Sequence, residues 1–448
     1  MVSARVLFTY ACCGAYDPSS LLFLRRIRRL LHQPQVYRAY CRSAWERLIR
    51  HSYDTVPYYR EVFAAAGLVR NRRVCAEHWA RVPLLTKDLL RGRPADMRSR
   101  RAFRTYRNTS GGSTGEPVVF VQDSRYRSRM IADTLLFFLL NGKQPGQREI
   151  KLWGSERDIL ENTVGIREKL INAAYNRILL NAFRLTDEII ERYVSVLRRE
   201  KTAALWTYVD SIAELARYIT ARGQSIGGRR LIVCTAGTLY PQLRQEIQQA
   251  FPEAAIINQY GSREVGQIAC QRGAEERLQV FAHSNRVELV DPDSGELIQE
   301  PGKAGRVVVT NLNNYSMPLM RFDTGDVAEA VGPPDSDAGC MQLRRVCGRE
   351  NTHLISAGGA RIHGEYFTHL LYFRPWLRRF QVLQPAVDQV EIRYIPAAGQ
   401  TVVPPEHRRE IVEKMKLVLG AGLSVRFTAV NELEKVGSGK YQFVCREF

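Results

Sequence analysis

The sequence lacks any hydrophobic run long enough to cross a bilayer. Its longest local apolar segment, Thr134–Leu140, falls far short of the ~18 residues that a transmembrane helix needs. It also lacks a Cys-x-x-Cys pair. The nine cysteines are scattered and odd in number, which indicates reduced thiols rather than a disulfide framework. The first residues match a signal peptide only weakly. These absences predict a cytoplasmic protein.

Negative charge is scarce relative to positive charge. Lysine and arginine number 65 against 46 aspartates and glutamates, a formal net charge of +19. A basic surface favours polyanions such as nucleotides, coenzyme A, nucleic acid or an acidic membrane. The excess is spread along the chain, which is typical of solvated faces, so we expect no specific nucleic-acid partner. Residues 21–31 mix leucine with arginine at the spacing of an amphipathic helix. We expect this helix to pack against the main body, with contact to an anionic membrane surface as the alternative.

A chain of 448 residues exceeds what one hydrophobic core usually holds. Residues 1–100 have helical patterns, whereas 101–349 alternate short apolar runs with amphipathic segments, which is typical of an α/β protein. The last stretch, 350–448, has its own strands and helix. We therefore expect an α/β fold: a large multi-layered N-terminal domain with β-sheets flanked by helices, in which 1–100 is the helical part, plus a small α+β C-terminal domain. The sequence does not indicate an oligomeric state.

A glycine-rich segment carries the strongest local signal: Asn108-Thr-Ser-Gly-Gly-Ser-Thr-Gly-Glu-Pro117. Its glycines let the backbone bend round an anion, and its hydroxyls and N–H groups can donate to phosphate oxygens. It is no Walker loop, because no Gly-Lys-Ser/Thr ends it. It also fits the nucleophile elbow of serine hydrolases formally, but that elbow needs a helix after it and here a strand-like run follows.

Three further segments add the chemistry of a nucleotide site. In Asn258-Gln-Tyr-Gly-Ser-Arg-Glu-Val-Gly266, a tyrosine offers a flat face for a base and a glutamate can bind a hard cation such as Mg²⁺. Arg321-Phe-Asp-Thr-Gly-Asp326 places two carboxylates near a predicted glycine turn. Such carboxylates can accept hydrogen bonds from the two hydroxyls of a sugar diol. Cys347-Gly-Arg349 and Gly437-Ser-Gly-Lys440 contribute a cation at each end of the C-terminal domain.

In this order and at these spacings, the motifs resemble the adenylate-forming superfamily. The greatest resemblance is to phenylacetate–CoA ligase-like proteins, in particular the CapK-like branch of capsule biosynthesis, and it runs from about residue 40 to the end. The resemblance implies an AMP-forming ligase that uses ATP and Mg²⁺, with 101–349 as the nucleotide- and acid-binding core and 350–448 as a mobile lid. Aryl and arylacetic acids are candidate substrates.

The resemblance also implies a role for each matching position. Ser110, Gly111, Gly112, Ser113, Thr114 and Gly115 would wrap the β- and γ-phosphates of ATP. Ala236, Gly237, Gln259 and Tyr260 would hold adenine, with Gly261 and Ser262 in the same nucleotide-binding segment. Glu264 would coordinate Mg²⁺ and act in catalysis, Asp326 would bind the ribose hydroxyls, and Arg349 would reach the ribose or phosphate. Lys440 would be catalytic, bridging the acid's carboxylate and the α-phosphate.

The acceptor of the acyl group is left open. Many relatives carry an aspartate or lysine as the hinge two residues after the Gly-Arg pair, whereas this chain has Asn351 there. The motifs therefore favour adenylation more strongly than thioester formation, and the acceptor is either coenzyme A or an amine or hydroxyl of a polysaccharide or natural-product precursor. The alternative hypothesis that involves no catalysis is a basic scaffold that binds polyanions. Cys270, His283, Cys340 and Cys347 lie where some relatives bind zinc, but their spacing lacks a close pair, so we expect free thiols.

Overall fold

The computed structural model describes residues 4–109, 118–154, 166–182, 185–228, 230–237, 239, 241–291, 294–346, 353–371, 374–397, 400, 402–431, 433 and 444–448. It divides the chain into two compact units. Unit 1 contains the described residues of 4–147 and 257–346, and unit 2 contains those of 148–256 and 353–448. Within the described ranges, no helix is long and apolar enough to cross a membrane.

Unit 1 begins with helices, as the sequence predicts. They are α1 (Ala4–Tyr16), α2 (Pro18–Leu30), α3 (Pro34–Thr55), α4 (Pro57–Ala66), a 3-10 helix (Ala76–Arg81), α5 (Lys87–Gly92) and α6 (Ser124–Leu140). Pro57 separates α3 from α4, because a proline disfavours helical angles in the residue before it, and Val56 is extended at φ −112° and ψ 114°. Asp17 caps α2 by accepting a hydrogen bond from Ser20 N.

The sheet of unit 1 is antiparallel. Its strand order is β12-β13-β14-β15-β11-β10-β9, and β3 and β4 form a separate hairpin. The bounds are β3 (Thr105–Thr109), β4 (Val119–Asp123), β9 (Ala255–Ser262), β10 (Gly266–Gln271), β11 (Leu278–Val280), β12 (Asn285–Val290), β13 (Ala304–Asn311), β14 (Phe322–Ala330) and β15 (Gln342–Val346). A two-stranded ribbon, β1 (Val69–Arg70) with β2 (Arg73–Val74), follows α4. The core of this unit includes Leu48, Phe63, Phe120, Val309 and Phe322, each nearly or fully buried.

Unit 2 contains a parallel sheet with strand order β8-β7-β5-β6. Its strands and helices alternate as predicted: β5 (Glu149–Trp153), α8 (Ile166–Ala174), β6 (Arg177–Asn181), α9 (Asp187–Arg199), β7 (Ala204–Tyr208), α10 (Val209–Ala221), β8 (Leu231–Thr235) and α11 (Pro241–Ala250). Helix α9 shows how its end residues stabilise a helix. Thr186 caps it, acidic residues occupy its first turn, and arginines occupy its last, so the charges oppose the helix dipole.

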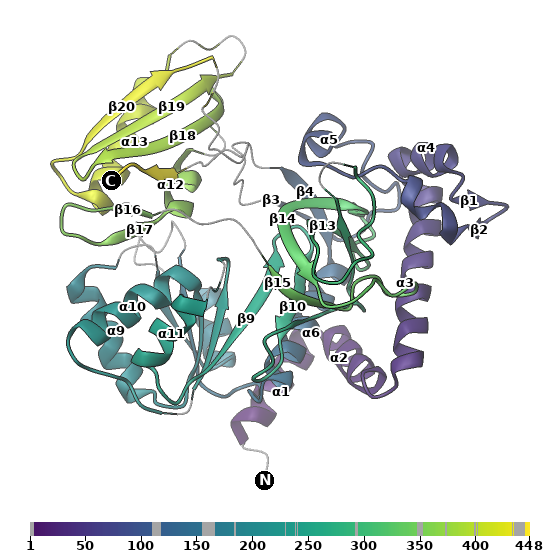
Figure 1. Cartoon of the computed structure of the whole chain (residues 1–448), viewed down its shortest axis with the longest axis horizontal. Coiled ribbons are helices and arrows are strands. Elements are labelled where there is room, and N and C mark those ends of the chain that lie inside the picture. Colours follow the sequence, from purple (N-terminus) through teal and green to yellow (C-terminus); the bar gives the residue numbers. More distant parts are fainter. Residues whose placement is uncertain are drawn as a thin grey trace. The chain divides into compact units, whose positions relative to one another are not determined.

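The C-terminal part of unit 2 has its own mixed sheet, ordered β20-β19-β18-β21. Its elements are β16 (His353–Ile355), β17 (Arg361–His363), α12 (Gly364–Leu371), β18 (Leu377–Ala386), β19 (Gln389–Pro396), α13 (Pro405–Leu419), β20 (Ser424–Ala429) and β21 (Val444–Arg446). Figure 1 shows β18, β19 and β20 side by side with α13 against them. The predicted fold class is confirmed in its α/β character and its separate C-terminal sheet. The boundaries at residues 100 and 349 and the mobility of the lid stay predictions.

Candidate active site

Tyr260 and Asp326 meet although their strands are not neighbours. The tyrosine hydroxyl donates to Asp326 Oδ2 at 2.8 Å and lies 3.5 Å from Thr324 Oγ1. In the strand order, β15, β11 and β10 separate β14 from β9. Across a flat sheet those four steps would span ~19 Å. The sheet of unit 1 therefore curves strongly, and this curvature brings the aromatic ring of one motif to the carboxylate of the other.

Hydrogen bonds fix the bulge within strand β14 that presents Asp326. Thr324 Oγ1 donates to Val307 O at 2.9 Å and accepts from Asp326 N at 3.2 Å. Gly325 has φ +77°, a left-handed conformation that glycine adopts without strain. Gly325 N donates to Asp323 Oδ1 at 2.9 Å, and Arg306 pairs with the other oxygen of that carboxylate at 3.0 Å. The two aspartates of the motif therefore differ: Asp323 holds the bulge, and Asp326 is presented beside Tyr260. The glycine turn expected from the sequence is thus a bulge inside a strand.

A buried ion pair anchors the start of β14. Arg321 Nε lies 3.5 Å from Glu288 Oε1, and each side chain is only 4% exposed. Arg321 Nη1 also donates to Ala80 O at 3.0 Å and to Val82 O at 2.5 Å. Trp79 Nε1 donates to Glu288 Oε2 at 3.0 Å, so both carboxylate oxygens are engaged. Since a lone buried charge is costly, this set of contacts fixes both Arg321 and the strand that follows it.

Close backbone packing explains the two glycines of the Tyr260 motif. A Cβ on Gly261 would lie 2.5 Å from Gly266 O. Gly266 has φ +78°, and a Cβ there would collide with the sulfur of Met130. No larger residue fits either position without a shift of backbone or helix α6. The glycines thus allow the tight turn that holds Glu264.

Glu264 is 7% exposed at the turn between β9 and β10. Gln122 Nε2 donates to Arg263 O at 2.9 Å and to Glu264 O at 3.5 Å, which ties the turn to β4. Burial raises the pKa of Tyr126 well above its usual value, and the nearby Glu264 charge adds to that shift. A single carboxylate of this kind fits Mg²⁺, which usually binds one or two protein carboxylates together with substrate phosphates and water.

The predicted adenine-binding positions of unit 2 follow β8. Ala236 has φ +59°, which is rare for a residue with a Cβ and typical of strained functional backbone. Gly237, next in the chain, is half-buried. Backbone that leaves a parallel strand at its carboxyl end is where α/β sheets commonly bind ligands. The adenine-binding role of Ala236 and Gly237 stays a prediction.

Comparison with known proteins finds relatives of two kinds. A family model of the CapK C-terminal domain matches residues 354–447. The sequence is 23% identical to "Protein CapK" of Staphylococcus aureus over 86% of this chain and 84% of that protein. It is 25% identical to a phenylacetate-coenzyme A ligase of Thermus thermophilus over 66% of this chain and 68% of that enzyme. The chain is a homologue of CapK and of the phenylacetate–coenzyme A ligases.

Solved structures agree on the fold. The crystal structure of 2-hydroxyisobutyryl-CoA ligase in complex with 2-HIB-AMP and CoA superposes with a TM-score of 0.55 at 16% identity. The match covers 93% of this chain and 91% of that one. A second crystal structure of the same ligase, in the postadenylation state, gives a TM-score of 0.54 over 91% of this chain. The predicted resemblance to the adenylate-forming superfamily, in its phenylacetate–CoA ligase-like and CapK-like branch, is confirmed.

Two groups of predicted site residues remain. The first comprises Gln259 and Ser262, whose side chains form hydrogen bonds. Gln259, 7% exposed, donates to Gln267 Oε1, and Ser262 Oγ accepts from Val265 N at 3.4 Å. The second group, comprising Ser110, Gly111, Gly112, Ser113, Thr114, Gly115, Arg349, Asn351 and Lys440, lies outside the described residues.

The structure describes three of the four candidate zinc ligands, Cys270, His283 and Cys340. Burial raises the pKa of Cys270 to about 12 and that of Cys340 to about 11, which disfavours the thiolates that zinc binds. His283 has both ring nitrogens engaged, Nε2 with Asp133 at 3.0 Å and Nδ1 with Tyr37 at 2.9 Å. Cys347 lies outside the described part of the chain. Within that part, no group of three or more His, Cys, Asp or Glu side chains could hold a metal ion.

Sequence reasoning missed a set of buried asparagines behind the Glu264 turn. Asn311 Nδ2 donates to Val265 O at 3.0 Å and to Asn285 Oδ1 at 2.9 Å. Its Oδ1 accepts from the backbone N–H groups of Asn313 and Asn314. These bonds link β12 and β13 to the residue after Glu264. The run Asn311-Leu-Asn-Asn314 was a usable signal, because asparagines that follow an apolar strand often satisfy buried backbone groups.

Proposed function

We propose that this protein is an ATP-dependent, AMP-forming ligase that adenylates a carboxylic acid and transfers the acyl group to coenzyme A. The observation that carries the proposal is the Tyr260–Asp326 pair, which joins an aromatic face to a carboxylate at 2.8 Å. A nucleoside needs both groups: a flat surface for its base and an acceptor for its ribose hydroxyls. A carboxylate can accept about four hydrogen bonds, so the bond from Tyr260 leaves capacity for a sugar diol.

The chemistry of adenylation accounts for the charged and polar residues of the predicted site. A carboxylate that attacks the α-phosphorus of ATP brings two anions together, and negative charge grows in the transition state. Glu264 would hold Mg²⁺, which neutralises phosphate charge when bound. Lys440 would bridge the acid and the α-phosphate, since a lysine is a compact point charge on a flexible stem. Ser110–Gly115 would wrap the β- and γ-phosphates with N–H and hydroxyl donors.

The two kinds of relative favour different acceptors of the acyl group. The phenylacetate–coenzyme A ligases favour an aryl or arylacetic acid and a thioester product. The CapK match covers more of the chain, and the C-terminal domain, which would form the lid, fits the CapK model. That match favours the second candidate, transfer to an amine or hydroxyl of a polysaccharide or natural-product precursor.

Acid-dependent ATP–pyrophosphate exchange tests the first half-reaction. We expect exchange with one class in a panel of aryl, arylacetic and short-chain acids, and loss of at least ~100-fold in Lys440→Ala, as for other charged groups that act in a transition state. Lys435→Ala, in the same segment, is the matched control and should retain exchange. Exchange that persists undiminished in Lys440→Ala would contradict the assigned mechanism.

The acceptor is tested with the acid that supports exchange. Coenzyme A should give a thioester and stoichiometric AMP, both measurable by mass spectrometry. Formation of an amide or ester with an amine or sugar acceptor, without any thioester, would establish the second candidate instead. Absence of ATP binding together with salt-sensitive binding of polyanions would favour the non-catalytic scaffold and overturn both.

A further inference from the structure

The first two helices present a surface that the ligase chemistry does not use. We name it the α1–α2 surface. It consists of Leu7, Phe8, Leu22, Arg25, Arg26 and Arg29. Its apolar members are strongly exposed: Leu22 is 69% exposed, Leu7 60% and Phe8 51%. On α2, Leu22 and the three arginines follow helical spacing and lie opposite the buried side chains of that helix.

Helices α1 and α2 contact each other along one seam. A Cβ on Gly14 would lie 3.4 Å from Leu21, and the positive charge of Arg28 acts on Tyr10, so the helices pack side by side along that seam. Both helices turn their buried residues into unit 1, and α2 lies against α6 (Figure 1). Helix α1, with its exposed Leu7 and Phe8, therefore lies beside α2, and Leu22, Leu30 and the three arginines of α2 line a shallow hollow.

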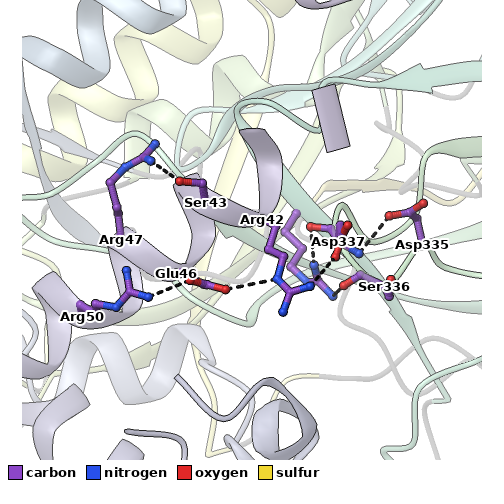
Figure 2. Close-up of polar contacts among 9 residues, drawn as sticks. Arg42, Ser43, Glu46, Arg47, Arg50, Asp335, Ser336 and Asp337 are labelled. Carbon is purple, nitrogen blue, oxygen red and sulfur yellow. Dashed lines mark hydrogen bonds and ion pairs between the residues drawn. The ribbon is translucent and has the colours of Figure 1, made fainter. Parts of the chain in front are cut away.

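These arginines lack the neutralising partners that others in the same unit have. Figure 2 shows Arg42 of α3 between Glu46 and Asp337, with Arg50 on the other oxygen of Glu46. Among the described residues, no carboxylate pairs with Arg25, Arg26 or Arg29. Residues 1–45 contain a single acidic residue, Asp17, whose carboxylate accepts from Ser19, Ser20 and Ser128.

Further arginines increase the positive potential beside this surface. Arg26 lies 4.8 Å above the ring of Tyr40, and the charges of Arg129, Arg47 and Arg125 also act on that tyrosine. Burial lowers the pKa of Arg129, and its neighbour Arg125 lowers it further. Because like charges gather here, an anion that binds the surface relieves repulsion as well as forming new pairs.

We propose that the α1–α2 surface docks the protein on membranes that contain anionic phospholipids. Guanidinium groups pair with phosphate in a two-pronged geometry, and leucine and phenylalanine side chains enter the boundary between headgroups and acyl chains. Binding to nucleic acid would explain the arginines, but nucleic acid offers no apolar region that could bury an aliphatic leucine. Each helix has 13 residues and is ~20 Å long, so both would lie in the interface rather than span it.

Vesicle co-sedimentation of the full-length protein tests the proposal. The probes are large vesicles of phosphatidylcholine alone and of phosphatidylcholine with phosphatidylglycerol. The first variant is Arg25→Gln/Arg26→Gln/Arg29→Gln, and the second is Phe8→Ser/Leu22→Ser. The control Arg38→Gln/Arg42→Gln/Arg50→Gln removes the same charge from α3, where carboxylates of the unit pair with the arginines. All these side chains are exposed, so the melting temperature should change little, which thermal unfolding verifies.

We expect binding to the anionic vesicles and not to phosphatidylcholine. The partition coefficient should fall about 100-fold in the α2 arginine variant, from roughly fivefold for each of the three arginines near the surface. The apolar variant should lose about tenfold or more, and the α3 control much less. Equal binding to both vesicle types would overturn the proposal, as would an α3 control that loses as much as the α2 variant. Tight binding of single- or double-stranded nucleic acid without vesicle binding would also overturn it.

Discussion

The hydroxyl of Tyr260 on β9 donates to Asp326 Oδ2 on β14 at 2.8 Å, although three strands separate β9 from β14 in the sheet. The bond holds the tyrosine ring and the carboxylate in fixed relation before any nucleotide arrives. Such preorganisation lowers the entropy cost of binding. The two residues are therefore expected to act together on nucleotide affinity.

Tyr260→Phe should weaken ATP binding modestly. It keeps the aromatic face and removes one hydrogen bond, which contributes about 1 kcal/mol, or roughly fivefold in KM for ATP. Tyr260→Ala removes the face as well and should cost about tenfold more. The KM for ATP in the exchange reaction measures both. An equal loss in the two variants would show that the ring itself contributes nothing.

Gly266→Ala should destabilise unit 1. The left-handed backbone costs about 1 kcal/mol for a residue with a Cβ, and the collision with Met130 adds about 1–3 kcal/mol. Gly273→Ala is the matched control, since its φ is +58° with no heavy atom within 4 Å of the new Cβ. Chemical denaturation should show a clearly smaller loss for the control. Adding Met130→Ala to Gly266→Ala should leave only the backbone strain and the lost Met130 packing.

Glu288→Ala should be far more damaging than Arg345→Ala. The first leaves Arg321 buried without its acid, which costs about 3–5 kcal/mol for a buried pair. The second removes an exposed arginine from Glu329 and should cost less than about 1 kcal/mol. The free energy of unfolding measures both changes. Similar values for the two would mean that the buried contact does not anchor β14.

Unit 2 should lose a small amount of stability in acid through Glu410. Hydrogen bonds from Arg374 and Lys414 lower the pKa of this carboxyl to about 2. Because the folded pKa lies below the unfolded one, the contribution is present above about pH 4.5 and is lost as the pH falls towards 2. Glu410 is 40% exposed, so solvent screening keeps the effect under about 1 kcal/mol. Glu410→Gln should flatten this part of the pH profile of unfolding, whereas an unchanged profile would contradict the assignment.

Local patterns account for many of the elements. The break at Pro57, the cap and charge pattern of α9, and the alternation of strands and helices from β5 to α11 all follow from neighbouring residues. The motifs of Tyr260 and Asp326 were also visible, because glycine turns with adjacent carboxylates or aromatic residues have few structural uses.

The contact between those motifs was not predictable from local patterns. It depends on the curvature of a sheet whose strands come from distant parts of the chain. The Asn311 and Asn285 bonds behind the Glu264 turn, and the Arg321–Glu288 pair, depend on the same tertiary arrangement. These residues position the backbone of the candidate site through contacts with distant parts of the chain. No local sequence motif therefore identifies them.

The most direct test of the central claim compares two carboxylates of one strand, Asp326 and Glu329, in acid-dependent ATP–pyrophosphate exchange. Asp326 faces Tyr260, whereas Glu329 pairs with exposed Arg345. We predict that Asp326→Asn raises the KM for ATP at least about tenfold, the loss of one charge-assisted contact, and that Glu329→Gln leaves it unchanged. Equal KM values for ATP in wild type and Asp326→Asn would contradict the assignment of Asp326 to the nucleotide.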